Sequence, residues 1–285
     1  DSSKLLIENL KKKYTSKDTL AEPSIQSTLQ KHKKNIIFTN DFKKIKKCDF
    51  VLITEDVKIL SDGTKDENKV STLIKKAIKN AKINSNFIIL SQVRVGFAKK
   101  IVTYAKERKK INFLNSPDIL TIGQALNDLD QKKTFIVGSE DKDLANNKSI
   151  NEFFLKIKKK VIFTNLQTVE VAKEAVQLKL GLDVTFVNLL SDFCKYNNAY
   201  TQDVIDYMKL DIRFSKKGYW RPGLGFGGGH IERGLKTFDK NLHTHYKDLI
   251  QGIIKFNEKR MDGFINYLIS NFKNFNNMSI GILGL

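Results

Sequence analysis

Short runs of β-branched and aromatic residues alternate with helix-length amphipathic segments over the first half of this 285-residue chain. Strands that are separated by helices need crossover connections, so this alternation predicts a mostly parallel sheet of the Rossmann-like α/β class. The expected strands cover residues 36–39, 50–54, 87–90, 111–114 and 134–137, and the expected helices cover residues 4–13, 24–33, 68–81, 98–108 and 119–129.

The second half of the chain reads as helical. After a strand at 161–164, a long helix is expected over 168–196, a shorter one over 202–208 and a last long one over 246–272. Apolar residues recur every three or four positions along the first of these, which indicates one stripe for core or dimer packing. The stripe consists of Val169, Ala172, Val176, Leu180, Val184, Val187 and Leu190.

Polar residues on a neighbouring face of the same long helix form a second pattern. Glu170, Lys173 and Gln177 follow one another at spacings that place them on one side of a helix, where they can point into one pocket. A solvated helix face is the structural alternative.

A glycine-rich segment, Arg221-Pro-Gly-Leu-Gly-Phe-Gly-Gly-Gly-His230, follows the short helix. Glycine allows positive φ and a close approach of the main chain to a ligand. One histidine closes the run and a helix appears to follow it, which is the layout of a binding loop beside one reactive side chain. A surface loop, with His230 capping the next helix, is the structural alternative.

The net charge of +19 invites a nucleic-acid interpretation, but only six of the 50 basic residues are arginine and the lysines are scattered. Arginine is the usual residue for reading bases and clamping phosphates, so we expect no nucleic-acid binding and a general attraction for anionic substrates. The two cysteines indicate neither a disulfide framework nor a zinc site, and His243 with His245 lacks a third ligand. We therefore expect no metal, no signal peptide, no membrane span and a cytoplasmic location.

Several segments, in this order and spacing, resemble the UDP-glucose/GDP-mannose dehydrogenase family, and within it the UDP-glucose 6-dehydrogenases most closely. The long helix with Glu170 and Lys173 is similar to the family's Ala-Glu-x-x-Lys helix, and Asn188 falls where its Asn-Glu pair begins. The other matching segments are Glu22-Pro23, Phe38-Thr-Asn-Asp41, Ser91-Gln-Val-Arg-Val-Gly96, Ser116-Pro-Asp-Ile-Leu120 and Gly225-Phe-Gly-Gly-Gly-His230.

The resemblance implies NAD-dependent oxidation of the primary alcohol of a UDP-sugar, a step of polysaccharide biosynthesis, by a homodimer. The catalytic residues that it implies are His230, Lys173, Asp118 and Gln177, with Lys173 stabilising negative charge and Asp118 acting as acid or base. The implied cofactor-binding residues are Asp1, Ser91, Gln92 and Arg233, and the implied substrate-binding residues are Arg213, Gly225, Phe226, Gly227 and Gly228.

The chain departs from the family's pattern at several of these positions. His230 stands where the family has its cysteine nucleophile, Gly234 replaces an aspartate, Gln92 a threonine and Gln177 an asparagine. A histidine cannot form the thioester of the second oxidation, but it can act as a base. We therefore expect a reaction that stops short of the acid, or alternatively a non-catalytic sugar-nucleotide-binding or assembly member of the family.

The resemblance also suggests a domain division. We expect a partial NAD-binding domain over 1–160, a central helical dimerisation domain over 161–275 and the start of a nucleotide-sugar-binding domain over 276–285, beginning with a strand. Asp1 would be the acidic residue that contacts the adenosine ribose, but the Gly-x-Gly-x-x-Gly turn that normally precedes it is absent. This predicts weak dinucleotide binding.

Overall fold

A computed structural model describes residues 3–13, 23–60, 64–117, 123–131, 133–157, 159–214, 216, 218–227, 230–241, 244–272 and 279–281. At 13, 23, 230, 233, 239–241 and 244–246 it describes the backbone alone. The chain forms two compact units, Asp1–Lys173 and Glu174–Leu285, which are described in turn.

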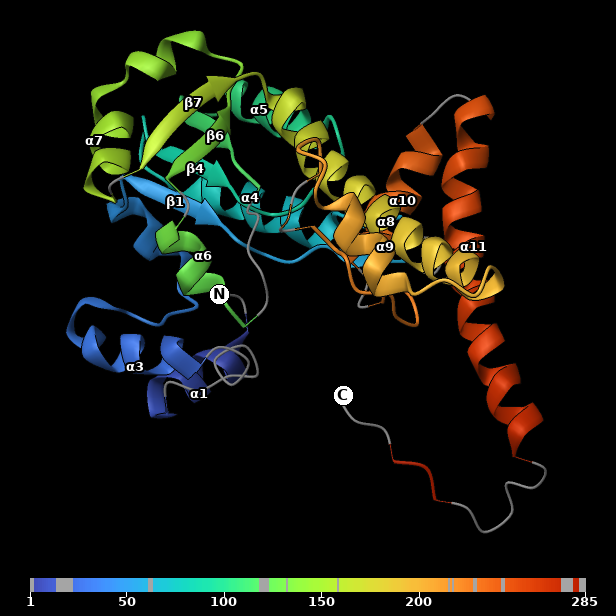
Figure 1. Ribbon diagram of the computed structural model, residues 1–285. Helices are drawn as coiled ribbons and strands as arrows, with labels where there is room; N and C mark the ends of the chain where they lie inside the picture. Colours follow the sequence, from blue (N-terminus) through green and yellow to red (C-terminus); the bar gives the residue numbers. More distant parts are fainter. Residues whose placement is uncertain are drawn as a thin grey trace. The chain divides into compact units, whose positions relative to one another are not determined.

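A five-stranded sheet forms the centre of the first unit (Figure 1). Its order is β1-β4-β5-β6-β7, and neighbouring strands are parallel except β5 and β6, which meet antiparallel through the single pair Asn115 and Gly138. The mostly parallel α/β fold is thereby confirmed. The strands are β1 (Phe50–Ile53), β4 (Asn86–Ile89), β5 (Asn112–Asn115), β6 (Thr134–Gly138) and β7 (Lys160–Thr164), and a separate hairpin pairs β2 (Lys58–Ile59) with β3 (Lys65–Asp66).

Helices cover both faces of this sheet (Figure 1). Alternate residues of β4 point to opposite faces, so Phe87 and Ile89 join the core beneath α4 and α5, while Ile88 joins the core beneath α7. All four residues of β4 are buried, as expected of a central parallel strand. The helices are α1 (Lys4–Lys13), α3 (Pro23–Lys31), α4 (Asn68–Asn80), α5 (Phe97–Lys106), α6 (Ala125–Gln131) and α7 (Lys148–Lys156), and the 3-10 helices are η1 (Lys33–Asn35), η2 (Phe42–Lys47) and η3 (Lys142–Asn146).

Three sequence-based expectations differ from the structure of the first unit. Residues 36–39 form no strand, because no neighbouring strand pairs with them and Ile37 stays 76% exposed. The helix expected from 119 begins at Ala125, with 118–122 outside the described residues. α7 was not predicted; it begins where the Asn147 Oδ1 accepts a hydrogen bond from the Ile150 N–H, at 3.1 Å.

Long helices dominate the rest of the chain: α8 (Leu166–Tyr196), α9 (Thr201–Met208), α10 (His230–Asn241) and α11 (Thr244–Asn271). The strand β7 pairs with β6 and thus belongs to the sheet unit, although the sequence-based division placed it in the helical domain. At the C-terminal end, Ile280 and Gly281 are exposed and form no strand, and the remainder of that expected strand, 282–285, lies outside the described residues.

The expected apolar stripe of α8 is only partly buried. Val169 and Val187 are buried, but Ala172 is exposed. The buried side chains of α8 include instead several polar ones, Glu170, Glu174, Gln177 and Asn188. The packing partners of α8 therefore select a face that its hydrophobic periodicity alone does not identify.

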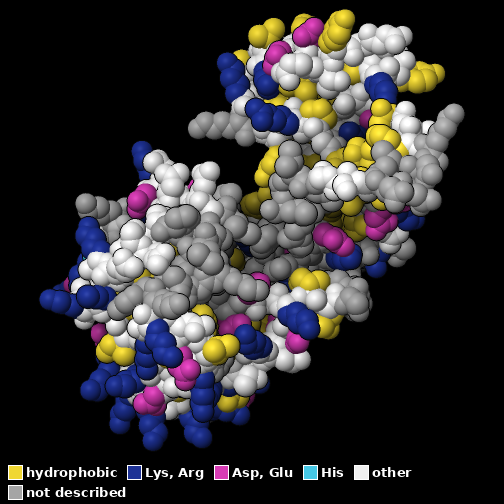
Figure 2. Space-filling model, turned by 90° about the horizontal axis from the view of Figure 1, so that it is seen from below, with side chains coloured by type: hydrophobic (Ala, Val, Ile, Leu, Met, Phe, Trp, Pro, Cys, Tyr) yellow, Lys and Arg dark blue, Asp and Glu magenta, His cyan; other side chains and the backbone are white. Residues whose placement is uncertain are grey.

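Lys and Arg side chains are spread over the face of the molecule shown in Figure 2, with Asp and Glu side chains among them. Eleven ion pairs are formed within the described residues, and most involve exposed side chains, which contribute little stability individually. Charge of both signs is thus distributed over this face.

Candidate functional site

The carboxyl ends of β4 and β5 carry the first group of candidate residues. Ser91 lies two residues after the end of β4, is buried, and its Oγ donates to the Ile53 carbonyl at 3.4 Å. On the next strand, the Ser116 N–H donates to the Ile89 carbonyl at 2.9 Å. These bonds align neighbouring strand ends at the edge of the sheet where open α/β folds bind ligands.

Unpartnered amide groups lie at the same strand ends. Asn115 is fully buried, yet neither its Oδ1 nor its Nδ2 has a hydrogen-bond partner among the described residues, and the Nε2 of Gln92 is likewise buried without one. A buried polar group without a partner costs free energy, so these atoms call for a ligand or water. Gln92 was predicted from the sequence, whereas Asn115 was not.

Glu170 has a structural role that its spacing did not reveal. Its carboxylate is 1% exposed and accepts hydrogen bonds from the backbone N–H groups of Gly96, at 2.6 Å, and Ala98, at 3.0 Å. Gly96 adopts φ +90°, so the glycine suits the turn that opens α5. Burial raises the pKa of the Glu170 carboxyl, although the two backbone bonds act in the opposite direction. Glu170 therefore caps α5, while Lys173 lies half-buried on the next turn of α8.

The glycine-rich loop is held by three side chains from two helices. On α8, the Asn188 Oδ1 accepts from the Gly223 N–H at 2.8 Å. On α11, Asn257 makes two bonds with the backbone of Phe226, at 2.8 and 3.0 Å, and the Arg260 Nε donates to the Gly223 carbonyl at 2.6 Å. The loop between 221 and 227 is therefore a fixed structure.

Gly225 is required by this arrangement. Its φ is +139°, and a Cβ atom at this position would lie 2.3 Å from the Asn257 Oδ1. The N–H groups of Leu224, Gly225 and Gly227 donate no hydrogen bond within the described residues. The loop thus presents free backbone donors, while the buried Phe226 side chain anchors it in a core with Leu235, Ile250 and Ile253.

The contact between α8 and α10 is unusually close at two glycines. A Cβ atom at Gly234 would lie 2.2 Å from the Gln177 Cβ, and one at Gly181 would lie 3.1 Å from the Ile231 side chain. Gln177 is buried, and its Oε1 has no partner among the described residues. The helix packing therefore leaves no room for the aspartate that the family pattern has at position 234.

The other site residues predicted from the sequence lie on different elements or outside the described residues. Arg213 is exposed and forms a bidentate pair with Asp211, its Nε lying 2.9 Å from the Asp211 Oδ1. This pairing lowers the pKa of Asp211. His230 and Arg233 lie in the first turn of α10, with only their backbone described. Asp1, Asp118 and Gly228 lie outside the described residues.

Asn257 and Arg260 hold the loop, although no sequence motif marks them as functional residues. They are one turn apart on α11, roughly 30 residues after the loop they bind. Their spacing places them on one helix face, but only the tertiary structure identifies the partner. Within the described parts of the chain, no three His, Cys, Asp or Glu side chains gather as a metal site, and no helix has the length and apolarity to cross a membrane.

Both halves of the chain match domains of one family. Residues 1–158 match the NAD binding domain of the UDP-glucose/GDP-mannose dehydrogenase family, and residues 167–259 match its central domain. Among curated proteins, the chain is 25% identical over 274 residues to the UDP-glucose 6-dehydrogenase TuaD of Bacillus subtilis, covering 93% of this chain and 59% of that protein. It is 26% identical over 255 residues to the UDP-glucose 6-dehydrogenase of Rickettsia typhi, covering 87% and 58%.

Solved structures show the same fold. A UDP-glucose dehydrogenase from Pyrobaculum islandicum superimposes with a TM-score of 0.79 at 19% identity, over 96% of this chain and 64% of that one. A UDP-D-ManNAc dehydrogenase from Pyrococcus horikoshii gives a TM-score of 0.81 at 17% identity, over 95% and 64%. The chain spans somewhat under 60% of the Bacillus and Rickettsia proteins. The chain belongs to the UDP-glucose/GDP-mannose dehydrogenase family.

Proposed function

We propose that this protein is an NAD-dependent nucleotide-sugar dehydrogenase that oxidises the primary alcohol of a UDP-sugar such as UDP-glucose. The glycine-rich loop carries the proposal, because its backbone is fixed by Asn188, Asn257 and Arg260 while other N–H groups of the loop remain free. Free backbone N–H groups in a glycine-rich loop suit the oxygens of a diphosphate. The relatives named above are themselves dehydrogenases of UDP-sugars.

The strand ends of the first unit fit NAD. The buried amide atoms of Asn115 and Gln92 lack partners among the described residues, and NAD carries both donors and acceptors that could satisfy them. We propose that Ser91, Gln92 and Arg233, with Asp1 at the ribose, hold the cofactor, which when bound supplies the acceptor for a hydride.

The catalytic roles follow the chemistry of the side chains. Lys173, as a cation, stabilises the negative charge that develops on the alcohol oxygen. His230 accepts the proton of the hydroxyl group as a hydride leaves the carbon that bears this group, which yields the aldehyde. Asp118 acts as an acid or base, Gln177 supports the substrate and Arg213, with the backbone of Gly225 to Gly228, binds the sugar nucleotide.

The reaction stops at the aldehyde, because an imidazole does not form the thiohemiacetal from which a second hydride is lost. We expect the protein to produce one NADH per UDP-glucose, measured as absorbance at completion with the product identified by mass spectrometry. In His230→Cys, a second NADH and the acid should appear.

His230→Ala is the matched control, since it removes the base without supplying a thiol and should reduce even the first oxidation. Two NADH per sugar with His230 intact would refute the shortened reaction.

The alternative is a non-catalytic member of the family that binds sugar nucleotides or supports assembly. It is favoured by the glycine at position 234, where helix packing excludes the aspartate of the family pattern. Calorimetric titration separates the two proposals. A dehydrogenase must bind both UDP-glucose and NAD, whereas a binder takes up only UDP-glucose.

We further propose that the protein is a homodimer in the cytoplasm. Cys48 and Cys194 are both free, which suits a reducing compartment. On α8, Phe186, Leu189 and Phe193 are exposed and recur at helical spacing. An exposed apolar stripe of this kind marks an interface, and a second copy of α8 is its simplest partner.

Leu189→Asp combined with Phe193→Asp should convert the dimer to a monomer in analytical ultracentrifugation, because it places charges in an interface that must lose its water. Leu155→Asp is the control, since Leu155 is 72% exposed, more than Leu189 or Phe193, but lies on α7. A double variant that sediments like the unaltered protein would place the dimer contact elsewhere or exclude it.

A further inference from the structure

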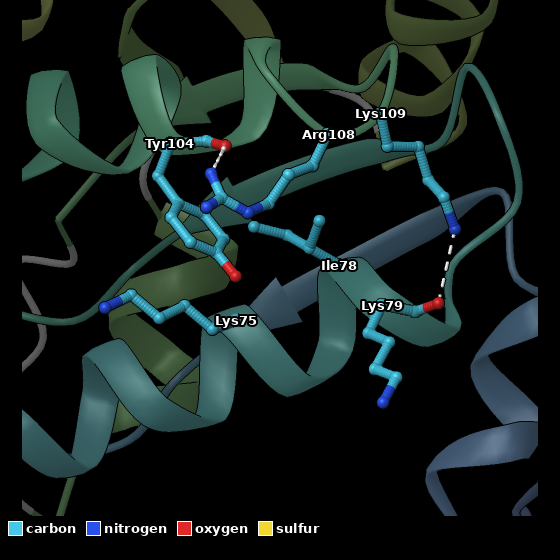
Figure 3. Close-up of a pocket in the computed structure, with 6 residues that line it drawn as sticks. All are labelled: Lys75, Ile78, Lys79, Tyr104, Arg108 and Lys109. Atoms are coloured by element: carbon cyan, nitrogen blue, oxygen red, sulfur yellow. Dashed lines mark hydrogen bonds between the residues drawn. The ribbon is translucent and has the colours of Figure 1, made fainter.

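A basic pocket lies between α4 and α5, away from the carboxyl ends of the strands. Its volume is about 380 Å³, within the range of small-ligand sites. Figure 3 shows the six residues that line it. They are Lys75, Ile78, Lys79, Tyr104, Arg108 and Lys109, so that four of the six are cations and none is a carboxylate.

Two pairs of side chains, each pair four residues apart in the sequence, line the pocket. Lys75 and Lys79 lie on α4, and Tyr104 on α5 is followed by Arg108 just beyond the helix end (Figure 3). Two lysines at this spacing repel each other. Within the described residues neither lysine forms an ion pair, so no described carboxylate offsets that repulsion.

Tyr104 orients the cations. The Arg108 guanidinium lies 3.9 Å from the centre of the Tyr104 ring, and the Lys75 Nζ lies 5.1 Å from it. Arg108 donates from Nη1 to the Tyr104 carbonyl, at 3.0 Å, and to Glu107, at 2.9 Å. Its Nε and Nη2 make no hydrogen bond within the described residues, so a fixed guanidinium keeps free donors.

Lys109 binds backbone carbonyls at the end of α4. Its Nζ donates to the Ala81 carbonyl at 2.6 Å and to the Lys79 carbonyl at 3.3 Å, which satisfies the end of α4. Lys109 therefore shapes the pocket wall, and Lys75, Lys79 and Arg108 remain as the groups that can meet a ligand. Three cations with free donors in one pocket match an anion with several negative charges.

We propose that this pocket binds a polyphosphate group, either inorganic polyphosphate or the triphosphate of a nucleotide. The guanidinium of Arg108 offers two adjacent donors to phosphate oxygens, and Lys75 and Lys79 supply two further charges. A second cavity of about 480 Å³ adjoins the pocket, since Lys75 and Tyr104 line both. Asp66 and Glu67 line that cavity beside Lys65, Arg94 and Lys100, and Arg94 is paired with Glu67, so the anion site is the first pocket.

The test is calorimetric titration of the protein with tripolyphosphate and, separately, with ATP, after saturation with UDP. If the proposed sugar-nucleotide site exists, UDP occupies it, so that the titrated anion cannot bind there. If that site does not exist, the effect of substituting Lys75 and Lys79 still tests the pocket. We expect binding that weakens with salt, and a loss of about tenfold or more in affinity in the double variant Lys75→Gln and Lys79→Gln. Tighter binding of ATP than of tripolyphosphate identifies a nucleotide as the ligand, and the reverse identifies inorganic polyphosphate.

The control is Lys99→Gln with Lys156→Gln, which changes the net charge equally outside the pocket. Both positions are exposed, so neither variant should disturb the core. Equal losses in the two double variants would show a general charge effect and overturn the proposal, as would an absence of binding to the unaltered protein. Far-ultraviolet circular dichroism of each variant confirms that it is folded.

Discussion

Gly234→Ala lowers the free energy of unfolding by about 2 kcal/mol, and Gly234→Asp lowers it further. Even a single methyl group at this position would lie 2.2 Å from the Gln177 Cβ and 2.8 Å from its Cγ, so α8 and α10 must move apart. Overpacking of this kind typically costs ~1–3 kcal/mol. An aspartate adds a charge in a buried place, which raises the cost. Urea denaturation of each variant measures the effect.

Gly263→Ala is the matched control. Gly263 also lies within a long helix, but a Cβ atom there would have nothing within 4 Å. The same substitution should therefore stabilise the protein, by about 0.5–1 kcal/mol, because alanine favours helix. Gln177→Gly should relieve part of the Gly234→Ala defect in a double-mutant cycle. Equal effects of alanine at 234 and 263 would contradict the close helix contact.

The crowding at Gly234 limits which departures from the family pattern can be reversed by substitution. Restoring the family's aspartate at position 234 cannot be a simple reversal, since the position is closed by Gln177 on the neighbouring helix. His230→Cys, by contrast, changes the residue that opens α10. The two departures from the family pattern are thus separable, and the histidine is the one to reverse first.

Glu170→Ala costs about 3 kcal/mol of unfolding free energy, the second large effect. Both carboxylate oxygens accept backbone N–H groups, at Gly96 and Ala98, and the substitution leaves these buried donors unpaired. It also removes a negative charge from the N-terminal end of α5, where the helix dipole favours one. Thermal and urea unfolding of the variant provide the measurement.

The contribution of Glu170 to the unfolding free energy changes with pH in a direction that follows from its raised pKa. Burial raises the pKa of Glu170 in the folded protein above its ordinary value of 4.5, so the folded state binds the proton more tightly than the unfolded state. The stabilisation from this difference is complete below pH 4.5 and is lost as pH rises through the folded pKa. Glu170→Gln cannot titrate. The unaltered protein should therefore exceed this variant in unfolding free energy by more at pH 4 than at pH 7, and a margin that grows with pH would disprove the assignment.

Hydrophobic periodicity was sufficient to predict most of the framework. The helices at 4–13 and 168–196 and the central strands came from patterns that local sequence carries, and tertiary contacts left them intact. The run at 36–39 failed because a β-branched segment becomes a strand only beside a partner. α7 was overlooked because its start depends on the side chain of Asn147, a residue that also favours turns.

The site was harder to predict, for a physical reason. Gly223 and Gly225 indicate an unusual backbone conformation in the loop. The side chains that fix this conformation, Asn257 and Arg260, lie on α11, far away in the sequence. Glu170 was grouped with Lys173 by helical spacing, whereas its partners are backbone amides of α5. Contacts between distant segments depend on packing, which one sequence does not display.

The single pair that joins β5 to β6 divides the sheet into two blocks of parallel strands. At this seam Gly138 is crowded by the Asn165 carbonyl oxygen, and a Cβ atom there would lie 2.8 Å from it. Because the seam has a single paired position, local opening there breaks fewer ladder hydrogen bonds than opening within either block. Asn115 is part of the seam. A molecule that hydrogen-bonds to its amide would therefore stabilise the junction of the two blocks, and binding of that molecule would make the whole sheet more rigid.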